Sequence, residues 1–228
     1  SINFNMYYFI VARKFSAVGK NSEWKLFTAI VVTASIFMTL SIRNIYPSIG
    51  DAVRIAVFQV VSIISTTGFG TADFDVWGGV AKTLIITLML IGACAGSTGG
   101  GLKVSRIMIM AKSAIRTVRE MIRPHSVSNI KLDGKTVEEE TVRTVSGYFI
   151  VYIAVIGVSL LLVGFNNFSF EETFSSVLTC INNIGPGFGT LGPVGNFSEL
   201  SDFSKIVLSF DMLLGRLELF PILLLFVP

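Results

Sequence analysis

Two glycine-rich polar stretches, each set between apolar segments, hold the residues best suited to chemistry in this chain. The first runs from Ser65 to Thr71 and the second from Asn182 to Thr190. Non-helical backbone at membrane depth is tolerated only where protein buries it or where it lines a water-filled cavity. A glycine-rich loop held there can direct its carbonyl oxygens at a cation and replace the cation's hydration shell. The pattern therefore predicts a cation filter made of backbone carbonyls.

The composition places these loops in a membrane protein. Of the 228 residues, 52% are hydrophobic and only 14% are charged, and the mean hydropathy is +0.72. Soluble domains carry about 25% charged residues. The net charge of +3 is too small to indicate a partner. Cys94 and Cys180 both fall in apolar segments, where we expect small core residues without a disulfide or a metal site.

Several helices are needed to position the loops. A helix that crosses a bilayer needs about 20 mostly apolar residues. The apolar pattern predicts spanning helices at 24–46, 76–95, 142–164 and 203–227, and short helices that precede the loops at 51–64 and 170–182. It also predicts a basic amphipathic helix at 104–122 and a polar linker at 124–140.

The order of spanning helix, short helix, polar loop and spanning helix occurs twice. Aligning Gly68 with Gly185 gives a period of 117 residues and also matches Val60 with Val177, Ser62 with Thr179 and Ile64 with Ile181. The literal Gly-Phe-Gly-Thr match at 68–71 and 187–190 is two residues out of that register, and we treat it as fortuitous. We therefore expect an internal repeat.

The distribution of charge predicts the orientation of the chain. Lys and Arg gather in residues 1–25 and 103–143, whereas the regions around the two loops carry mainly Asp and Glu. Basic connections favour the cytoplasmic side. We expect the loops to face outside, with residues 103–140 in the cytoplasm. An acidic outer mouth would concentrate cations.

A third glycine-rich stretch, Gly96 to Lys103, interrupts the chain after the second spanning segment. Three successive glycines weaken a helix, so a mobile plug is a fair inference and a simple helix kink is the alternative. The spacing excludes a phosphate-binding P-loop, because Leu102 follows the last glycine and Val104 follows the lysine.

Arg216 lies inside the apolar run from 206 to 227, where a charge is costly and usually functional. It could face a pore, or it could form an ion pair with Asp211 or Glu218. The spacing of two residues puts Glu218 off its helical face. His125, the one histidine, is expected to be solvated in the linker. Without a Ser–His or Cys–His pair in the membrane, an enzyme has no support.

The motifs, taken together, resemble those of the Trk/Ktr/HKT superfamily of potassium transporters, in particular the C-terminal half of its TrkH-type subunits. The resemblance covers nearly all of the chain and keeps the order of the motifs. They are Ser65 to Phe74, Gly96 to Lys103, Asn182 to Gly189 and Gly215 to Glu218.

The resemblance implies an all-α, potassium-channel-like membrane protein in which four M1–P–M2 repeats (helix, pore helix, filter loop, helix) surround one pore. This chain would hold the third repeat at 23–123 and the fourth, truncated at its end, at 141–228. Residues 1–22 would be the end of the preceding repeat with a cytoplasmic linker, and 124–140 a second cytoplasmic linker. The chain would thus start inside a larger protein.

The resemblance also implies roles for single residues. The filter would be Thr66, Thr67, Gly68, Phe69, Asn183, Ile184, Gly185 and Pro186. K⁺ would be bound by the backbone carbonyls of Thr66, Thr67, Gly68, Asn183, Ile184 and Gly185. The gate loop would be Gly96, Ser97, Thr98, Gly99, Gly100, Gly101 and Lys103. Arg216 would be an electrostatic barrier below the filter.

The expected function is potassium uptake across the bacterial inner membrane, with K⁺ as the transported ion and no covalently bound cofactor. Expected partners are the N-terminal half of the same protein, a second copy in a homodimer, a cytosolic nucleotide-binding regulatory subunit of the TrkA/KtrA type and the lipid membrane, but no nucleic acid. The basic helix 103–123 is either a positive-inside anchor or a docking surface. A Na⁺-permeable or Na⁺-coupled transporter is the alternative, although both filter glycines favour K⁺. A membrane scaffold or enzyme is a remote alternative.

Overall fold

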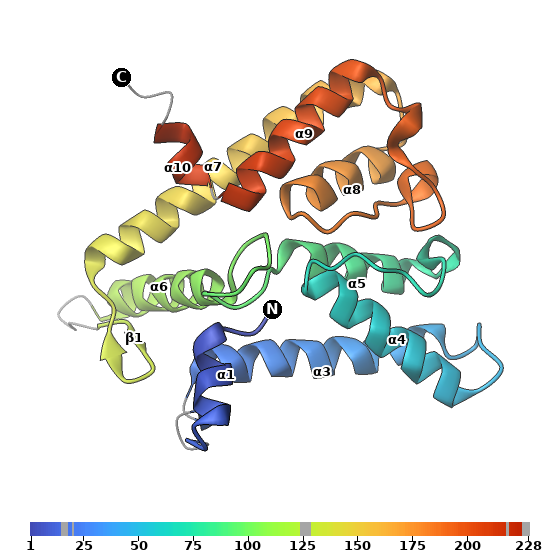
Figure 1. Ribbon diagram of the computed structural model, residues 1–228. Coiled ribbons are helices and arrows are strands. Elements are labelled where there is room, and N and C mark those ends of the chain that lie inside the picture. Colours follow the sequence, from blue (N-terminus) through green and yellow to red (C-terminus); the bar gives the residue numbers. More distant parts are fainter. Residues whose placement is uncertain (15–17, 20, 124–128, 218, 225–228) are drawn as a thin grey trace.

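The computed structural model describes residues 1–14, 18–19, 21–123, 129–217 and 219–224, and nearly all of its regular structure is helical (Figure 1). The all-α prediction is therefore confirmed. His125 and Glu218 lie outside the described residues, so the predictions made for them have no structural counterpart.

The first half of the chain forms a unit around one long helix and one short helix. Its helices are α1 (Phe4–Val11), α3 (Ser22–Ile42), α4 (Ile49–Ile64), the 3₁₀ turn η1 (Phe74–Val76) and α5 (Gly79–Leu90). Asn21 caps α3 by accepting from the amide of Trp24, and Ser48 caps α4 by accepting from Asp51. Such caps satisfy amides that have no partner inside the helix.

A hairpin follows the basic helix α6 (Val104–Ile122) and was not predicted. Its strands are β1 (Lys131–Leu132) and β2 (Lys135–Thr136), which pair antiparallel. Asp133 and Gly134 have φ of 51° and 81°, as two-residue hairpin turns require. The Asp133 carboxylate accepts a hydrogen bond from the Ser22 amide at 2.6 Å, so the hairpin is attached to the start of α3.

The second half repeats the arrangement of the first. It comprises α7 (Glu139–Val163), η2 (Gly164–Asn166), α8 (Phe170–Ile181), η3 (Gly189–Leu191), η4 (Phe197–Glu199), α9 (Asp202–Leu217) and α10 (Leu219–Leu224). In Figure 1, α7 and α9 run side by side, with the shorter α8 next to them. Ser169 and Glu172 form a reciprocal capping box at the start of α8.

One predicted span is wrong in extent. The span predicted at 76–95 is helical only from Gly79 to Leu90, because the chain then turns into a loop whose backbone pairs with itself. Of the span predicted at 203–227, residues 203–217 (in α9) and 219–224 (α10) are helical, and residues 218 and 225–227 lie outside the described residues.

Two helices in the described part of the chain are long and apolar enough to cross a membrane: Ser22–Ile42 and the continuous helical stretch Glu139–Asn166. Both expose large apolar side chains on their outer faces. Examples are Ile36, Phe37 and Leu40 on α3, and Ile150, Val158 and Leu161 on α7. Apolar outer faces suit contact with lipid or with further apolar protein.

The two larger hydrophobic cores hold the units together, and each includes residues from the other unit. The core of α3, α4 and α5 includes Ile184 and Phe188 from the second unit. The core of α7, α8 and α9 includes Leu102, which comes from the first. Cys94 and Cys180 are buried and free, as predicted. The two units therefore interlock at the polar loops.

Candidate functional site

The two polar loops have the same backbone conformation at an offset of 117 residues. Thr66 and Asn183 have φ of 52° and 55°, and Gly68 and Gly185 have φ of 77° and 120°. Positive φ is unfavourable for residues other than glycine, so its recurrence at matched positions is informative. The register chosen from the sequence is thus reproduced in the backbone.

The amides of both loops donate hydrogen bonds to the short helix that precedes each loop. In the first loop, the amides of Thr67 and Gly68 donate to the Ser62 carbonyl at 2.9 and 3.3 Å. In the second, the amide of Ile184 donates to the Thr179 carbonyl and that of Gly185 to the Thr179 hydroxyl, both at 2.9 Å. Ser62 and Thr179 occupy matched positions.

The carbonyl oxygens behave differently. Among the described residues, none accepts a hydrogen bond from another group at the six positions predicted to bind K⁺, which are Thr66, Thr67, Gly68, Asn183, Ile184 and Gly185. A carbonyl oxygen that accepts no hydrogen bond can coordinate a cation. Both loops therefore keep their oxygens available while their amides are fixed.

The two loops touch each other. A β-carbon built on Gly68 would lie 1.8 Å from the Ile184 carbonyl oxygen, so only glycine fits at this position. A β-carbon on Gly185 would meet nothing within 4 Å. Further out, the rings of Phe74 and Phe188 pack edge to face with centroids 5.3 Å apart. The two polar loops, which we call the filter loops after the role expected from the sequence, thus form one side-by-side surface that is open beyond Gly185.

The third glycine-rich segment is a loop rather than a kink in a continuous helix. It starts at Ile91, five residues before the predicted Gly96, and ends at Lys103. Ile91 and Leu102 form a parallel bridge, and the amide of Gly92 donates to the Leu102 carbonyl at 2.7 Å. We call residues 91–103 the intramembrane loop. Its two arms, residues 91–95 and 102–103, lie next to each other, and residues 96–101 form the tip that joins them.

The tip of the intramembrane loop lies against both filter loops. The Gly100 amide donates to the Thr66 hydroxyl at 3.2 Å. A β-carbon on Gly100 would lie 2.4 Å from the Asn182 carbonyl oxygen, and one on Gly101 would lie 2.7 Å from the Asn182 side-chain oxygen. The glycines are therefore required for close approach as well as for chain reversal. Thr66 and Asn182 belong to different units, so the tip spans both.

Arg216 reaches the same place from α9. Its guanidinium donates to the Thr98 carbonyl at 2.8 Å, and among the described residues no carboxylate lies within ion-pair distance of it. Asp211, the partner considered from the sequence, is buried and accepts from the Ser159 hydroxyl at 2.7 Å instead. The alternative considered from the sequence, an Arg216–Asp211 ion pair, is therefore not formed.

A cavity of about 250 Å³ lies between the intramembrane loop and α9. The Arg106 guanidinium lies 4.0 Å from the centre of the Tyr148 ring, and Lys103 donates to the Gly99 carbonyl. Three basic side chains thus surround a small polar space next to the filter loops. Its lining is Ser97, Thr98, Gly99, Gly100, Gly101, Lys103, Arg106, Tyr148, Gly215 and Arg216.

Three charged residues that support the site were not assigned this role from the sequence. Lys82 on α5 forms ion pairs with Asp75 at 3.3 Å and with Glu171 at 3.0 Å, and so ties the two units together. Glu172 accepts from the Thr190 amide at 2.9 Å, and this bond holds the pKa of Glu172 below its ordinary value. The third, Glu23, is buried. Glu171 and Glu172 lie in the first turn of α8, where acids are common, and no sequence signal identifies their distant partners.

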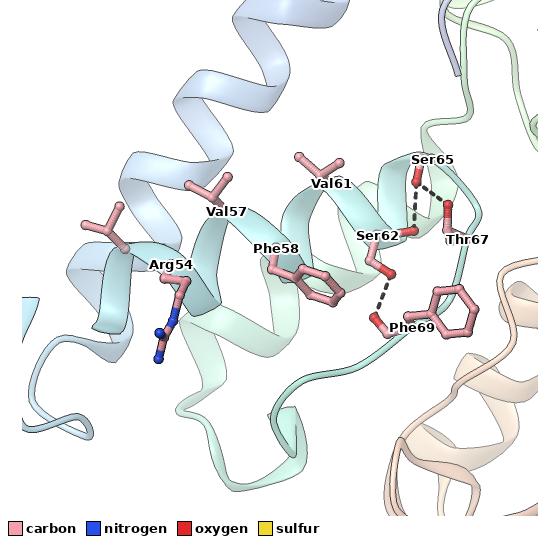
Figure 2. Close-up of a pocket in the computed structure, with 9 residues that line it drawn as sticks. Arg54, Val57, Phe58, Val61, Ser62, Ser65, Thr67 and Phe69 are labelled. Carbon is pink, nitrogen blue, oxygen red and sulfur yellow. Dashed lines mark hydrogen bonds between the residues drawn. The ribbon is translucent and has the colours of Figure 1, made fainter. Parts of the chain in front are cut away.

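An apolar groove borders the first filter loop on its open side. It has a volume of about 590 Å³ and lies along the outer face of α4, as Figure 2 shows. Val57, Phe58 and Val61 line it from the helix, and Phe69 from the loop. A second groove of about 460 Å³ borders the other filter loop at Asn183 to Gly185. The filter surface is thus flanked by apolar grooves on two sides.

Comparison with known proteins gives consistent matches over nearly the whole chain. The model of the TrkH family, described as a cation transport protein, matches residues 15–228. The Trk system potassium uptake protein TrkH of Salmonella typhimurium is 35% identical over 232 residues, which cover 99% of this chain and 47% of that protein. TrkG of Escherichia coli K12, also a Trk system potassium uptake protein, is 27% identical over 229 residues, covering 99% of this chain and 47% of that protein.

The fold has a counterpart among solved structures. The crystal structure of the potassium transporter TrkH from Vibrio parahaemolyticus superposes with a TM-score of 0.90 at 34% identity. The match covers 99% of this chain and 49% of that chain. This chain spans about half the length of the curated relatives it matches.

Proposed function

Because this chain belongs to the TrkH family of cation transport proteins, we propose that it is half of a potassium-translocating subunit and that its two filter loops form part of a selectivity filter. The chain is an all-α membrane protein, and its relatives are named as potassium uptake proteins. The proposal covers transport by the whole protein and the roles of single residues in this half.

The observation that carries the proposal is the contrast between amides and carbonyls in the filter loops. All six amides donate to the preceding short helix or its last turn, whereas none of the six carbonyls accepts a hydrogen bond among the described residues. Carbonyl oxygens held in this way can replace the water around a dehydrated K⁺. Because the amides fix the backbone, the oxygens need little reorganisation when the ion arrives.

A complete filter needs more than these two loops. We propose that residues 23–123 and 141–228 are the third and fourth of four M1–P–M2 repeats, and that the preceding half of the same protein supplies the other two. The open space beside Gly185 and the apolar grooves on both flanks support this arrangement. The coverage of 47% of the relatives' length agrees with it.

Below the filter, the intramembrane loop would act as a gate and Arg216 as a charge barrier. Contact between the loop tip and both filter loops supports the first role. The second is supported by the position of Arg216 at the basic cavity, without a carboxylate partner among the described residues. A cation that leaves the filter would meet positive charge and a closed loop.

The proposed membrane orientation and partners rest on which segments lie at the two ends of the molecule. In Figure 1, the end of α6 and the hairpin lie opposite the connections that leave the filter loops. The basic end would face the cytoplasm of a bacterial cell, where α6 and the hairpin could meet a nucleotide-binding regulatory subunit. A homodimer is part of the same proposal, and the naming of the relatives as Trk system components supports a multi-subunit assembly.

The experiment is ion flux through the full-length protein, expressed in bacteria that lack their own potassium uptake. We expect growth at low external K⁺, and K⁺ uptake that excess Na⁺ does not inhibit. Equal uptake of Na⁺ would favour the Na⁺-permeable alternative, and Na⁺-dependent K⁺ uptake would favour coupling. Failure of a correctly inserted protein to move either ion would overturn the transport function.

A further inference from the structure

Glu23 is a buried carboxylate in the first turn of α3, with only 6% of its surface exposed. Burying a charged side chain is costly unless it is paired or hydrogen-bonded. Apolar packing on α3 would be served equally well by an uncharged residue. The partners of Glu23 therefore explain why an acid is tolerated here.

One carboxylate oxygen of Glu23 receives two hydrogen bonds from distant backbone. The Ala95 amide donates to it at 2.7 Å, and the Ser105 amide donates to it at 3.0 Å. Ala95 lies on the entering arm of the intramembrane loop, and Ser105 is the second residue of α6, directly after the loop. The two donors thus flank the whole segment from Gly96 to Lys103.

The negative charge of Glu23 is also suited to the start of α6. Lys103 occupies the capping position of α6 but makes no side-chain capping bond. The first amides of a helix lack intrahelical partners, and the helix dipole favours an anion beside them. The Glu23 carboxylate on α3 accepts from the Ser105 amide and so takes the place of the side-chain cap that Lys103 does not provide. Its two bonds are charge-assisted and so stronger than neutral ones.

Two backbone contacts at the base of the intramembrane loop are neutral, and the charge-assisted bond from Lys103 to the Gly99 carbonyl stays within the loop. The Cys94 amide donates to the Ser1 carbonyl at 3.0 Å, and the Phe4 amide donates to the Gly96 carbonyl at 3.3 Å. The contacts to Thr66 and Arg216 are at the tip. A charge-assisted clasp across both arms is therefore well placed to decide whether the loop stays folded against the filter.

We propose that Glu23 is a positioning residue that clasps the two arms of the intramembrane loop and thereby sets its closed state. This inference rests on the proposed gating function. In the described part of the chain, the hydrogen bonds of Glu23 go to the Ala95 and Ser105 amides and not to the filter loops, so its effect would pass through the intramembrane loop. Loss of the clasp should let the arms separate and the tip withdraw from Thr66 and Asn182.

The test uses the full-length protein with Cys94→Ala, Cys180→Ala and every cysteine of the preceding half replaced, so that Leu102→Cys, at a position that is 6% exposed on the leaving arm of the loop, introduces a single thiol. The rate at which a water-soluble thiol reagent labels this cysteine reports separation of the two arms, and K⁺ flux is measured in parallel. We expect Glu23→Ala to raise the labelling rate several-fold and to raise K⁺ flux. Glu23→Gln keeps an acceptor oxygen without the charge, so both values should lie between wild type and Glu23→Ala.

Glu140→Ala is the matched control, because it removes an exposed acid from α7 and should change neither value. Unchanged labelling in folded Glu23→Ala protein would overturn the clasp. If Glu23→Ala does not fold, wild-type labelling and flux in Glu23→Gln would overturn the clasp equally.

Deleting residues 97–101 separates the role of Glu23 from the proposed gating function. If that deletion leaves flux unchanged, the gating function fails, while labelling still decides whether Glu23 holds the loop. Increased labelling without increased flux, beside a deletion that does raise flux, would also refute the role of Glu23 in closure.

Discussion

The two units share the backbone of their filter loops but differ in the helix that follows. In the first unit, α5 has 12 residues and ends at Leu90, where the intramembrane loop begins. In the second, α9 has 16 residues and continues to Leu217, carrying Arg216 in its last turn. One unit thus contributes a loop, and the other a charge, to the same cavity.

The filter loops and the helices that follow them are constrained in different ways. Local hydrogen bonds to Ser62 and Thr179 fix the filter backbone, so it stays the same although the loop sequences differ. The following helices depend instead on glycine content, and the first unit has four glycines at 96–101 that weaken a helix. Under the proposed function, near-symmetric loops would suit an ion that is coordinated from all sides, and the asymmetric elements would lie where we propose the gate.

The largest expected effect comes from removing the asymmetric element. Deleting residues 97–101 should raise K⁺ flux through the full-length protein by about tenfold or more, which corresponds to lowering the barrier by about 1.4 kcal/mol. The deletion should be tolerated, because Ile91 and Leu102 are already adjacent across the base of the loop. Flux measured with radioactive Rb⁺ or K⁺ at equal protein levels tests this.

Ser97→Ala is the control for the deletion. It removes only the bond from the Ser97 hydroxyl to the Cys94 carbonyl and leaves the loop in place. Wild-type flux after the deletion, in correctly inserted protein, would mean that the intramembrane loop does not obstruct the path. The difference between α5 and α9 would then concern packing rather than gating.

Patterns of hydropathy and glycine predicted much of this architecture. The short helices before the loops agree with α4 and α8 to within two residues at each end, and the basic helix at 104–122 has the bounds of α6. The register of 117 residues also holds in the backbone. Such features depend on neighbours in sequence, so a local pattern is enough to find them.

Contacts between distant segments were not predictable in the same way. Glu23 binds amides that lie 72 and 82 residues away, and Lys82 pairs with Glu171 across the two units. Neither pairing leaves a periodic signal in one sequence. The early end of α5 was missed because its apolar residues continue past Leu90, and only the pairing of Gly92 with Leu102 ends the helix. The hairpin had a signal, Asp133-Gly134, that was read only as part of a linker.

The second prediction concerns the filter glycines. Gly68→Ala should overlap the Ile184 carbonyl and distort both loops, and an alanine at positive φ adds roughly 1–2 kcal/mol of strain. If the full-length protein closes a ring of four loops, a neighbouring loop should occupy the space beside Gly185. Gly185→Ala should then be as severe, and each variant should lower the K⁺ over Na⁺ preference at least tenfold, or about 1.4 kcal/mol.

Competition of Na⁺ with K⁺ uptake measures this preference, and Gly157→Ala on α7 is a matched control with no contact near the added carbon. A clearly milder Gly185→Ala would show that the two loops are not equivalent in the whole protein. Unchanged preference in both variants would remove these glycines from the filter.

The third prediction concerns the charge on α9. Arg216→Ala should raise K⁺ flux several-fold, because a unit positive charge about 8 Å from a cation costs about 2 kcal/mol at an effective dielectric constant of about 20. Arg216→Lys keeps the charge and should stay near wild type, whereas the loss of the Thr98 bond alone would affect both variants. Lower amounts of folded protein without faster uptake would indicate a structural role instead.

The smallest expected effect concerns the connections that leave the filter loops. Residues 69–78, which join the first loop to α5, are held by the Ser62 hydroxyl, which donates to the Phe69 carbonyl at 2.6 Å, and by the ion pair of Asp75 with Lys82. The longer connection at 186–201 is tied to α8 by Glu172, whose carboxylate accepts from the amide and hydroxyl of Thr190. Glu172→Gln should lower the free energy of unfolding of the full-length protein by roughly 1 kcal/mol at pH 7, since a hydrogen bond to a charged group is worth about 1.5–3 kcal/mol and a neutral one about 0.5–1.5 kcal/mol. The control is Glu199→Gln, which replaces an exposed acid on the same connection.

The pH dependence gives a second test. Because the bond from the Thr190 amide lowers the pKa of Glu172, the contribution of Glu172 to the free energy of unfolding is fully present above the unfolded pKa of about 4.3. It is lost as the pH falls through the lower folded value. The stability difference between wild type and Glu172→Gln should therefore be constant from pH 7 to about pH 5 and shrink below pH 4. A difference that persists undiminished at pH 3 would show that the carboxylate charge does not hold this connection.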